Sequence, residues 1–134
     1  RFWITLQQGV DFVLKNFERM LGGEIFVPKI PSIRITDLAK AMAPEIPVKI
    51  VGVRPGEKLH EMMCPGDMAF HTFEYEDHYV IAPAIKFFNR SNDFKTNALG
   101  EKGNAVIEGF EYVSDTNPHF LTVDEISSFD REEK

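Results

Sequence analysis

The sequence predicts an α/β fold for the first half of the chain, because helical and extended segments alternate there with short connections. Three observations support this. Apolar residues recur at helical spacing over residues 6–21, a short run of strand-forming residues covers 24–27, and a β-branched run fills 48–53. The first 66 residues are therefore expected to form helix, strand, helix, strand and helix.

The first two helices have recognisable ends. The first is expected to begin after Thr5, whose hydroxyl suits an N-cap, and to end at Gly22 and Gly23. The second is expected over residues 37–43, with Thr36 as its N-cap.

The stretch around Arg54 is expected to carry the chemistry. A strand over residues 48–53 should run into a helix over 57–63, because Pro55 suits a first helical turn. At such a junction, Arg54 could clamp a phosphate with its planar fork of donors, while Glu57 accepts hydrogen bonds from sugar hydroxyls. The alternative is a surface Arg–Glu pair at a helix end, worth well under ~1 kcal/mol.

The second half changes character after residue 66, where aromatic and acidic residues follow no sustained period. We expect residues 1–66 to form an α/β lobe and residues 67–134 to form a partly irregular extension that packs on it. The elements expected in the extension are short strands at 79–81 and 85–88, a polar loop over 91–109, and a capped helix that begins after Thr122.

Composition narrows the functional classes. The chain has 134 residues, of which 43% are hydrophobic, and a net charge of −6 without a basic patch, which argues against a nucleic-acid partner. No apolar run approaches the ~20 residues of a membrane span. The single cysteine, Cys64, fits a reducing compartment, so we expect the cytoplasm. The start at Arg1, without an initiator methionine, suggests a piece of a larger protein, and processing of the chain is the alternative.

Several catalytic signatures are missing from the sequence. No glycine-rich dinucleotide fingerprint and no Tyr-x-x-x-Lys pair occur, and the segment 100–103 (GEKG) is interpreted as a turn. The segment from His60 to Cys64 lacks the second histidine of a zinc helix, and His71 and His78 are interpreted as solvated or hydrogen-bonded. We therefore expect no catalytic, cofactor-binding or metal-binding residue in this chain.

Four segments carry a resemblance to a known family: RFWIT at 1–5, GEIFVPKIPS at 23–32, ITDLA at 35–39 and GVRPGEKLHE at 52–61. Looser matches follow as DHYVI at 77–81, GEKG at 100–103 and FEY at 110–112. Together they resemble the C-terminal part of the inverting UDP-N-acetylglucosamine 4,6-dehydratases, which belong to the extended short-chain dehydrogenase/reductase superfamily. These enzymes feed pseudaminic acid and related surface-glycan pathways.

The resemblance implies a small substrate-binding lobe that closes over a UDP-sugar beside a Rossmann domain carrying NADP. The parent enzyme would be a lyase that converts UDP-N-acetylglucosamine to a 4-keto-6-deoxy sugar nucleotide. It would also form a homo-oligomer. The family's catalytic Asp, Lys and Tyr lie in the N-terminal portion and match no position here, so this chain alone is expected to be inactive.

The resemblance also assigns substrate-binding residues. Arg1 and Arg54 would contact the diphosphate from opposite sides, and Glu57 would accept hydrogen bonds from the ribose hydroxyls. These roles agree with the phosphate and sugar contacts that the residue types at 54–57 indicate. Two alternatives remain open. The same lobe could belong to a UDP-sugar epimerase, or the chain could be a non-catalytic module that binds a UDP-sugar or a partner surface.

Overall fold

The computed structural model describes residues 1–85 and 93–132, and the chain divides into two compact units. Unit 1 combines residues 1–3, 30–61 and 113–134, and unit 2 combines 4–29 and 62–112. Each unit therefore joins segments that are distant in the sequence. The predicted division at residue 66, into a lobe and an extension, follows the chain and stays a prediction.

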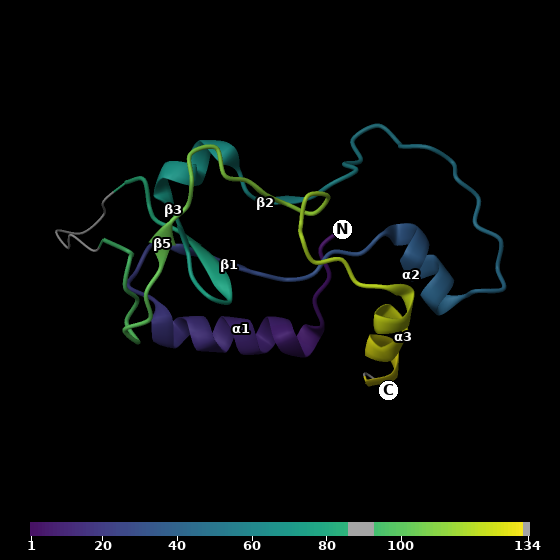
Figure 1. Ribbon diagram of the computed structural model, residues 1–134, viewed down its shortest axis with the longest axis horizontal. Coiled ribbons are helices and arrows are strands. Elements are labelled where there is room, and N and C mark those ends of the chain that lie inside the picture. Colours follow the sequence, from purple (N-terminus) through teal and green to yellow (C-terminus); the bar gives the residue numbers. More distant parts are fainter. Residues whose placement is uncertain (86–92, 133–134) are drawn as a thin grey trace. The chain divides into compact units, whose positions relative to one another are not determined.

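Unit 2 is built on an antiparallel sheet with the strand order β1-β4-β3-β5 (Figure 1). Its strands are β1 (Ile25–Pro28), β3 (Thr72–Glu74), β4 (His78–Ile81) and β5 (Asn104–Ala105). All four residues of β4 are buried, because this strand has a partner on each side. A 3₁₀ helix, η1 (Gly66–His71), leads into β3, and β2 (Met62–Cys64) pairs with β6 (Tyr112–Val113) in a separate two-stranded sheet.

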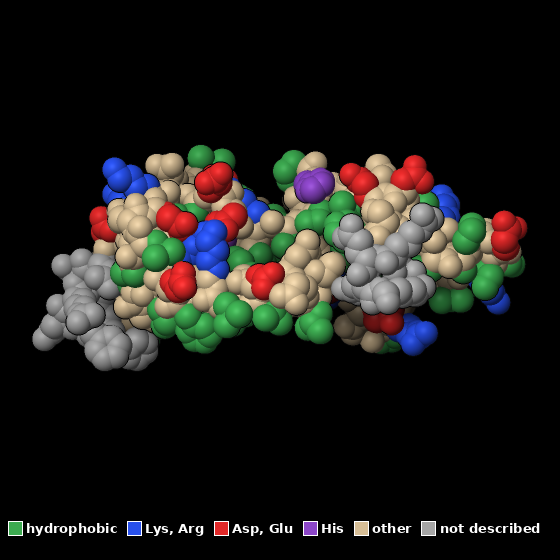
Figure 2. Space-filling model, turned by 90° about the horizontal axis from the view of Figure 1, so that it is seen from below, with side chains coloured by type: hydrophobic (Ala, Val, Ile, Leu, Met, Phe, Trp, Pro, Cys, Tyr) green, Lys and Arg blue, Asp and Glu red, His purple; other side chains and the backbone are tan. Residues whose placement is uncertain are grey.

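The helix α1 (Leu6–Arg19) lies along this sheet with its polar side inward. Its start is the predicted one: Thr5 Oγ1 accepts from the Gln8 amide at 3.1 Å, and the Gln8 side chain accepts from the Thr5 amide at 3.1 Å, forming a capping box. The buried residues of α1 are Asn16 and Arg19. A stripe of large apolar residues faces solvent instead, along the edge where hydrophobic side chains gather in Figure 2: Leu6, Val10, Val13, Leu14 and Phe17.

Unit 1 is held by two helices, α2 (Ile35–Met42) and α3 (Val123–Glu132). Its core consists of Ile33, Leu121 and Ile126, and the side chains packed against it are Trp3, Leu38, Ala41 and Phe129. Backbone hydrogen bonds tie the segments around this core, since the Leu121 amide donates to the Ser32 carbonyl at 2.9 Å and the Trp3 amide to the Pro31 carbonyl at 2.8 Å.

The locally signalled elements are confirmed. The first helix, the strand near 24–27, the second helix, the strand at 79–81 and the last helix all form. At the last helix Thr122 caps as expected, because its Oγ1 accepts from the Glu125 amide at 3.3 Å. The predicted N-cap Thr36 is wrong: it lies inside α2, whose N-cap is Arg34. Most of the predicted strand at 85–88 lies outside the described residues.

Two central predictions are wrong. Residues 48–53 form no strand and residues 57–63 form no helix; residues 43–61 are instead a long connection, with β2 starting at Met62. Every residue from 44 to 61 is exposed. A strand needs a neighbour to satisfy its backbone donors and acceptors, and the described part of the chain offers none to this run.

We expect the substitution Ile33→Ala to lower the free energy of unfolding by about 2–4 kcal/mol, because it leaves a cavity where the side chain is 1% exposed. The matched control is Ile107→Ala, at a position that is 78% exposed. It should change stability by less than about 0.5 kcal/mol. Urea denaturation of both variants checks this, and equal effects would contradict the core assignment.

Candidate functional site

The residues predicted to bind substrate lie in unit 1, on the exposed connection and near it. Arg54 and Glu57 form a closed turn: the Arg54 amide donates to Glu57 Oε2 at 3.0 Å, and the Glu57 amide donates to the Arg54 carbonyl at 3.1 Å. Arg54 Nε lies 3.8 Å from Glu57 Oε1, and the Arg54 side chain is 79% exposed. The arrangement in this chain is therefore a surface Arg–Glu pair, not a junction between a strand and a helix.

Arg1 contacts the same connection a few residues further along. Its guanidinium donates to the Lys58 carbonyl oxygen and to the Glu61 carboxylate. The structure thus brings all three predicted residues to one loop, over residues 54–61. Both guanidiniums face carboxylates, so a bound anion would have to compete with Glu57 for Arg54 and with Glu61 for Arg1.

The end of this loop is fixed to the last third of the chain. The Ser114 amide donates to the Glu61 carbonyl at 2.8 Å, and the Glu61 amide donates to Ser114 Oγ at 2.9 Å. Ser114 is buried, and His60 Nε2 lies 3.6 Å from Asp115 Oδ2. Residues 60 and 61 are consequently anchored, while the part from 48 to 53 has no comparable contacts in the described structure.

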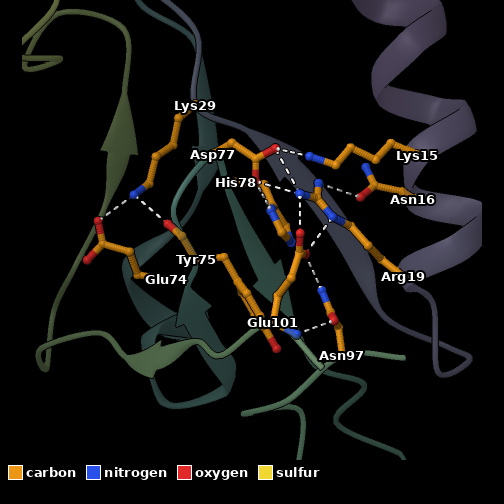
Figure 3. A network of polar contacts seen from close by, with 10 residues as sticks. All are labelled: Lys15, Asn16, Arg19, Lys29, Glu74, Tyr75, Asp77, His78, Asn97 and Glu101. Carbon is orange, nitrogen blue, oxygen red and sulfur yellow. Dashed lines mark hydrogen bonds and ion pairs between the residues drawn. The ribbon is translucent and has the colours of Figure 1, made fainter. Parts of the chain in front are cut away.

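A buried polar network in unit 2 was not predicted from the sequence (Figure 3). The Arg19 side chain is 2% exposed. Its Nε donates to Glu101 Oε2 at 2.8 Å, and its Nη2 donates to the two Asp77 carboxylate oxygens at 3.0 and 2.9 Å. Asn97 Nδ2 donates to Glu101 at 2.6 Å. One guanidinium therefore joins α1, the residue before β4 and the loop that precedes β5.

His78 extends this network into an aromatic setting. Its ring is fully buried and stacked on the Tyr75 ring, with centroids 4.7 Å apart, and its Nδ1 lies 2.7 Å from Asp77 Oδ1. Burial lowers the pKa of His78 against the opposing effect of Asp77. Burial tends to raise the pKa of Asp77, but hydrogen bonds from His78 and Arg19 hold that pKa well below its usual range.

This network has a structural role rather than the geometry of a catalytic site. His78 Nε2 is buried and has no hydrogen-bond partner within the described residues, and the rings of Phe12, Phe26 and Tyr75 surround the imidazole. The sequence predicted that His78 is solvated or hydrogen-bonded; the ring is hydrogen-bonded and excluded from solvent. The signal that could have revealed the rest is the polar side of α1, which carries an arginine where a helix facing a sheet normally carries an apolar residue.

The glycine segment at 100–103 does not fit a dinucleotide. Asn97 Oδ1 accepts from the Leu99 and Glu101 amides at 3.1 and 3.0 Å, which closes the turn on itself. A Cβ at Gly103 would lie 2.5 Å from the Tyr75 ring, so the space beside this glycine is filled by an aromatic side chain and not left for a phosphate. This glycine segment thus does not form a dinucleotide-binding loop.

The described residues contain no group of three or more His, Cys, Asp or Glu side chains arranged to hold a metal ion. None of the described helices has the length and apolar character needed to cross a bilayer. Cys64 is a free thiol, and burial raises its pKa to about 11, which makes it a poor nucleophile.

Comparison with known proteins gives one family and several relatives. Residues 1–83 match the family model described as polysaccharide biosynthesis protein. Two proteins from Campylobacter jejuni, serotypes O:2 and O:23/36, each named UDP-N-acetylglucosamine 4,6-dehydratase (inverting), are 58% and 56% identical over 94% of this chain. A UDP-glucose 4-epimerase from Rickettsia rickettsii is 32% identical over 82% of it. The chain spans 38% of the Campylobacter relatives' length and 33% of the Rickettsia relative's.

The fold has a counterpart among solved structures. An X-ray structure of Pen from Bacillus thuringiensis matches 99% of this chain and 38% of its own, with a TM-score of 0.74 and 25% sequence identity. The predicted fold class, a small α/β lobe of an extended short-chain dehydrogenase/reductase, is confirmed.

We expect the stability of the chain to fall as the pH drops below about 6.5, the usual pKa of an unfolded histidine. The pKa of His78 is lowered in the folded state, so below this pH the unfolded chain binds a proton that the folded chain excludes. The decline continues until the pH reaches the folded pKa. Asp77, whose folded pKa is lowered, adds a second decline below about pH 4.

The measurement is the free energy of unfolding at about pH 7.5 and about pH 5.5, on either side of the ordinary histidine pKa. The variant His78→Gln should show a smaller difference between the two values. The control His71→Gln, at an exposed histidine, should keep the full difference. A His78→Gln variant with the same pH dependence as the parent would refute the assignment.

Proposed function

The chain belongs to the polysaccharide biosynthesis protein family, and from this premise we propose that it is the nucleotide-sugar-binding part of a UDP-N-acetylglucosamine 4,6-dehydratase. The observation that carries the proposal is the identity of 58% and 56% to two relatives of that name over 94% of the chain. The full-length protein would be a lyase that removes water from the sugar and gives a 4-keto-6-deoxy sugar nucleotide for surface glycans of the pseudaminic acid type.

The proposed substrate site consists of Arg1, Arg54 and Glu57. Two guanidiniums match the two phosphates of a UDP-sugar, and a carboxylate matches the ribose diol. Their common location on the loop 54–61 supports the proposal, because Arg1 reaches this loop through Lys58 and Glu61. In this proposal the diphosphate replaces the carboxylate partners of the two arginines.

Catalysis is assigned to the part of the full-length protein outside this chain. The acid and base residues and the NADP site belong there, and the 134 residues alone are inactive. NADP, when bound, supplies the hydride chemistry of such an enzyme; none of the described residues is proposed to hold it. We also propose that the full-length protein is a homo-oligomer. We place it in the cytoplasm, because the free, buried Cys64 suits a reducing compartment.

A UDP-sugar epimerase is the second candidate, and it is supported by the 32% identity to a UDP-glucose 4-epimerase. An epimerase would use the same diphosphate and ribose contacts on the lobe. Product analysis of the full-length enzyme with UDP-N-acetylglucosamine separates the two. A dehydratase yields a product lighter than its substrate by one water, whereas an epimerase yields an isomer of equal mass.

The proposal predicts that Arg54→Ala in the full-length enzyme weakens UDP binding by about 2 kcal/mol, the size of a charge-assisted contact. Titration calorimetry with UDP and with UDP-N-acetylglucosamine measures this. The matched control is Arg34→Ala, which removes another exposed arginine of unit 1, whose guanidinium lies 3.8 Å from Asp37 and over the Phe120 ring. It should leave binding unchanged. Unaltered affinity in Arg54→Ala would reject the assigned site.

The variant Arg54→Lys refines the test. Lysine keeps the charge but loses the planar fork of donors. We expect it to restore only part of the lost affinity if Arg54 contacts the diphosphate with two nitrogens. Full recovery with lysine would indicate that only the charge matters.

A further inference from the structure

Ser114 lies where the exposed connection over residues 44–61 is held, and it is 1% exposed. Its amide donates to the Glu61 carbonyl at 2.8 Å, and its Oγ accepts from the Glu61 amide at 2.9 Å. Within the described residues, the hydrogen bonds that reach 44–61 from other segments come from Arg1 and Ser114. The buried serine is therefore a fixed point for an otherwise exposed loop.

The backbone of Arg1 is held by a different segment. The Ile33 amide donates to the Arg1 carbonyl at 2.7 Å. The neighbouring Ser32 is buried, and its Oγ accepts from Asn117 Nδ2 at 3.0 Å. The same nitrogen donates to the Ile30 carbonyl at 2.8 Å. The base of the Arg1 side chain thus has a fixed position, and the orientation of its guanidinium depends on the loop that it reaches.

The guanidinium of Arg1 has two kinds of acceptor on that loop. Nη2 donates to the Lys58 carbonyl oxygen, and Nη1 donates to the Glu61 carboxylate. A carboxylate competes with a phosphate for the guanidinium because both are anions, whereas a carbonyl is neutral and leaves the positive charge available. A diphosphate can therefore displace Glu61 from Nη1 while Nη2 stays on Lys58. The Lys58 carbonyl keeps its place only if the loop end at Glu61 is fixed.

We propose that Ser114 is a positioning residue for the diphosphate of the substrate. It fixes the backbone of Glu61, the fixed loop end presents the Lys58 carbonyl to Arg1, and this carbonyl orients the guanidinium toward a phosphate. The role rests on the proposed function, since Arg1 is one of its substrate-binding residues. Without the anchor, a smaller fraction of molecules holds Arg1 in the binding geometry, and the apparent affinity falls in proportion.

The experiment is titration calorimetry of the full-length enzyme with UDP, on Ser114→Ala, Arg1→Ala and the double variant. We expect Ser114→Ala to weaken binding by about fivefold, as for the loss of one hydrogen bond. In the Arg1→Ala background the same substitution should have little effect, because the group that Ser114 positions is gone. Equal losses in both backgrounds would overturn the inference, since Ser114 would then act independently of Arg1.

Two controls separate positioning from stability. Ser127→Ala removes another hydroxyl of unit 1, which donates to the Val123 carbonyl at 2.9 Å inside α3. Ile126→Val removes one methyl group from the core of the same unit. Both should leave the UDP affinity unchanged. Ser114→Ala should raise KM for UDP-N-acetylglucosamine and keep kcat within about twofold of the parent value. A lower kcat with unaltered UDP affinity would contradict the positioning role.

Ser114→Cys covers the case in which the alanine variant does not fold. Cysteine is close to serine in size, but its sulfur is a weak hydrogen-bond acceptor. We therefore expect Ser114→Cys to fold and to lose UDP affinity in the same way. Parental affinity in a folded Ser114→Cys variant would overturn the inference.

The Arg1→Ala titration also distinguishes this inference from the proposed function. Weaker UDP binding in Arg1→Ala, together with unchanged affinity in Ser114→Ala, would keep the substrate site and reject the role of Ser114. Unchanged affinity in Arg1→Ala would reject Arg1 as a substrate-binding residue, and the role of Ser114 with it.

Discussion

The structure of unit 2 depends on the buried guanidinium of Arg19. A buried charge without partners costs several kcal/mol, so this side chain requires both Asp77 and Glu101 in their observed positions. Those two carboxylates come from the residue before β4 and from the loop that precedes β5. Asp77 is held ionised there and accepts from His78 Nδ1, which fixes the ring orientation, while burial holds the pKa of the imidazole below its usual value. One guanidinium with two carboxylate partners thus sets the geometry of three segments.

The same contact explains why α1 presents its apolar residues to solvent. A helix on a sheet normally buries its hydrophobic stripe, but α1 turns Asn16 and Arg19 inward to reach the network. The stripe around Leu6 and Phe17 is left uncovered in the described structure. Unit 1 has a comparable feature in residues 48–53. Each unit therefore carries an exposed apolar surface of the kind that proteins usually bury. The chain spans only 38% of the length of its Campylobacter relative, so residues outside this chain could cover such surfaces.

The sequence predicted those features that depend on neighbouring residues. The cap at Thr5, the strand that follows Gly23 and the last helix after Thr122 arise from interactions a few residues apart, so their patterns are visible in the sequence. The prediction of a strand at 48–53 was wrong because a strand also requires a partner strand, and the periodicity of a sequence contains no information about that partner. The Arg19 cluster was missed for the related reason that its members are 58 and 82 residues apart in the chain.

The exposed Arg54–Glu57 pair is compatible with a ligand site despite its surface position. Exposed ion pairs contribute under about 1 kcal/mol, so a diphosphate can displace Glu57 from Arg54 at small cost. The gain depends on desolvation, because a charge-assisted hydrogen bond is worth about 1.5–3 kcal/mol only where water is excluded. Nothing in the loop itself provides that exclusion, since every residue from 44 to 61 is exposed. Under our proposal, the part of the full-length protein outside this chain therefore has to supply that exclusion.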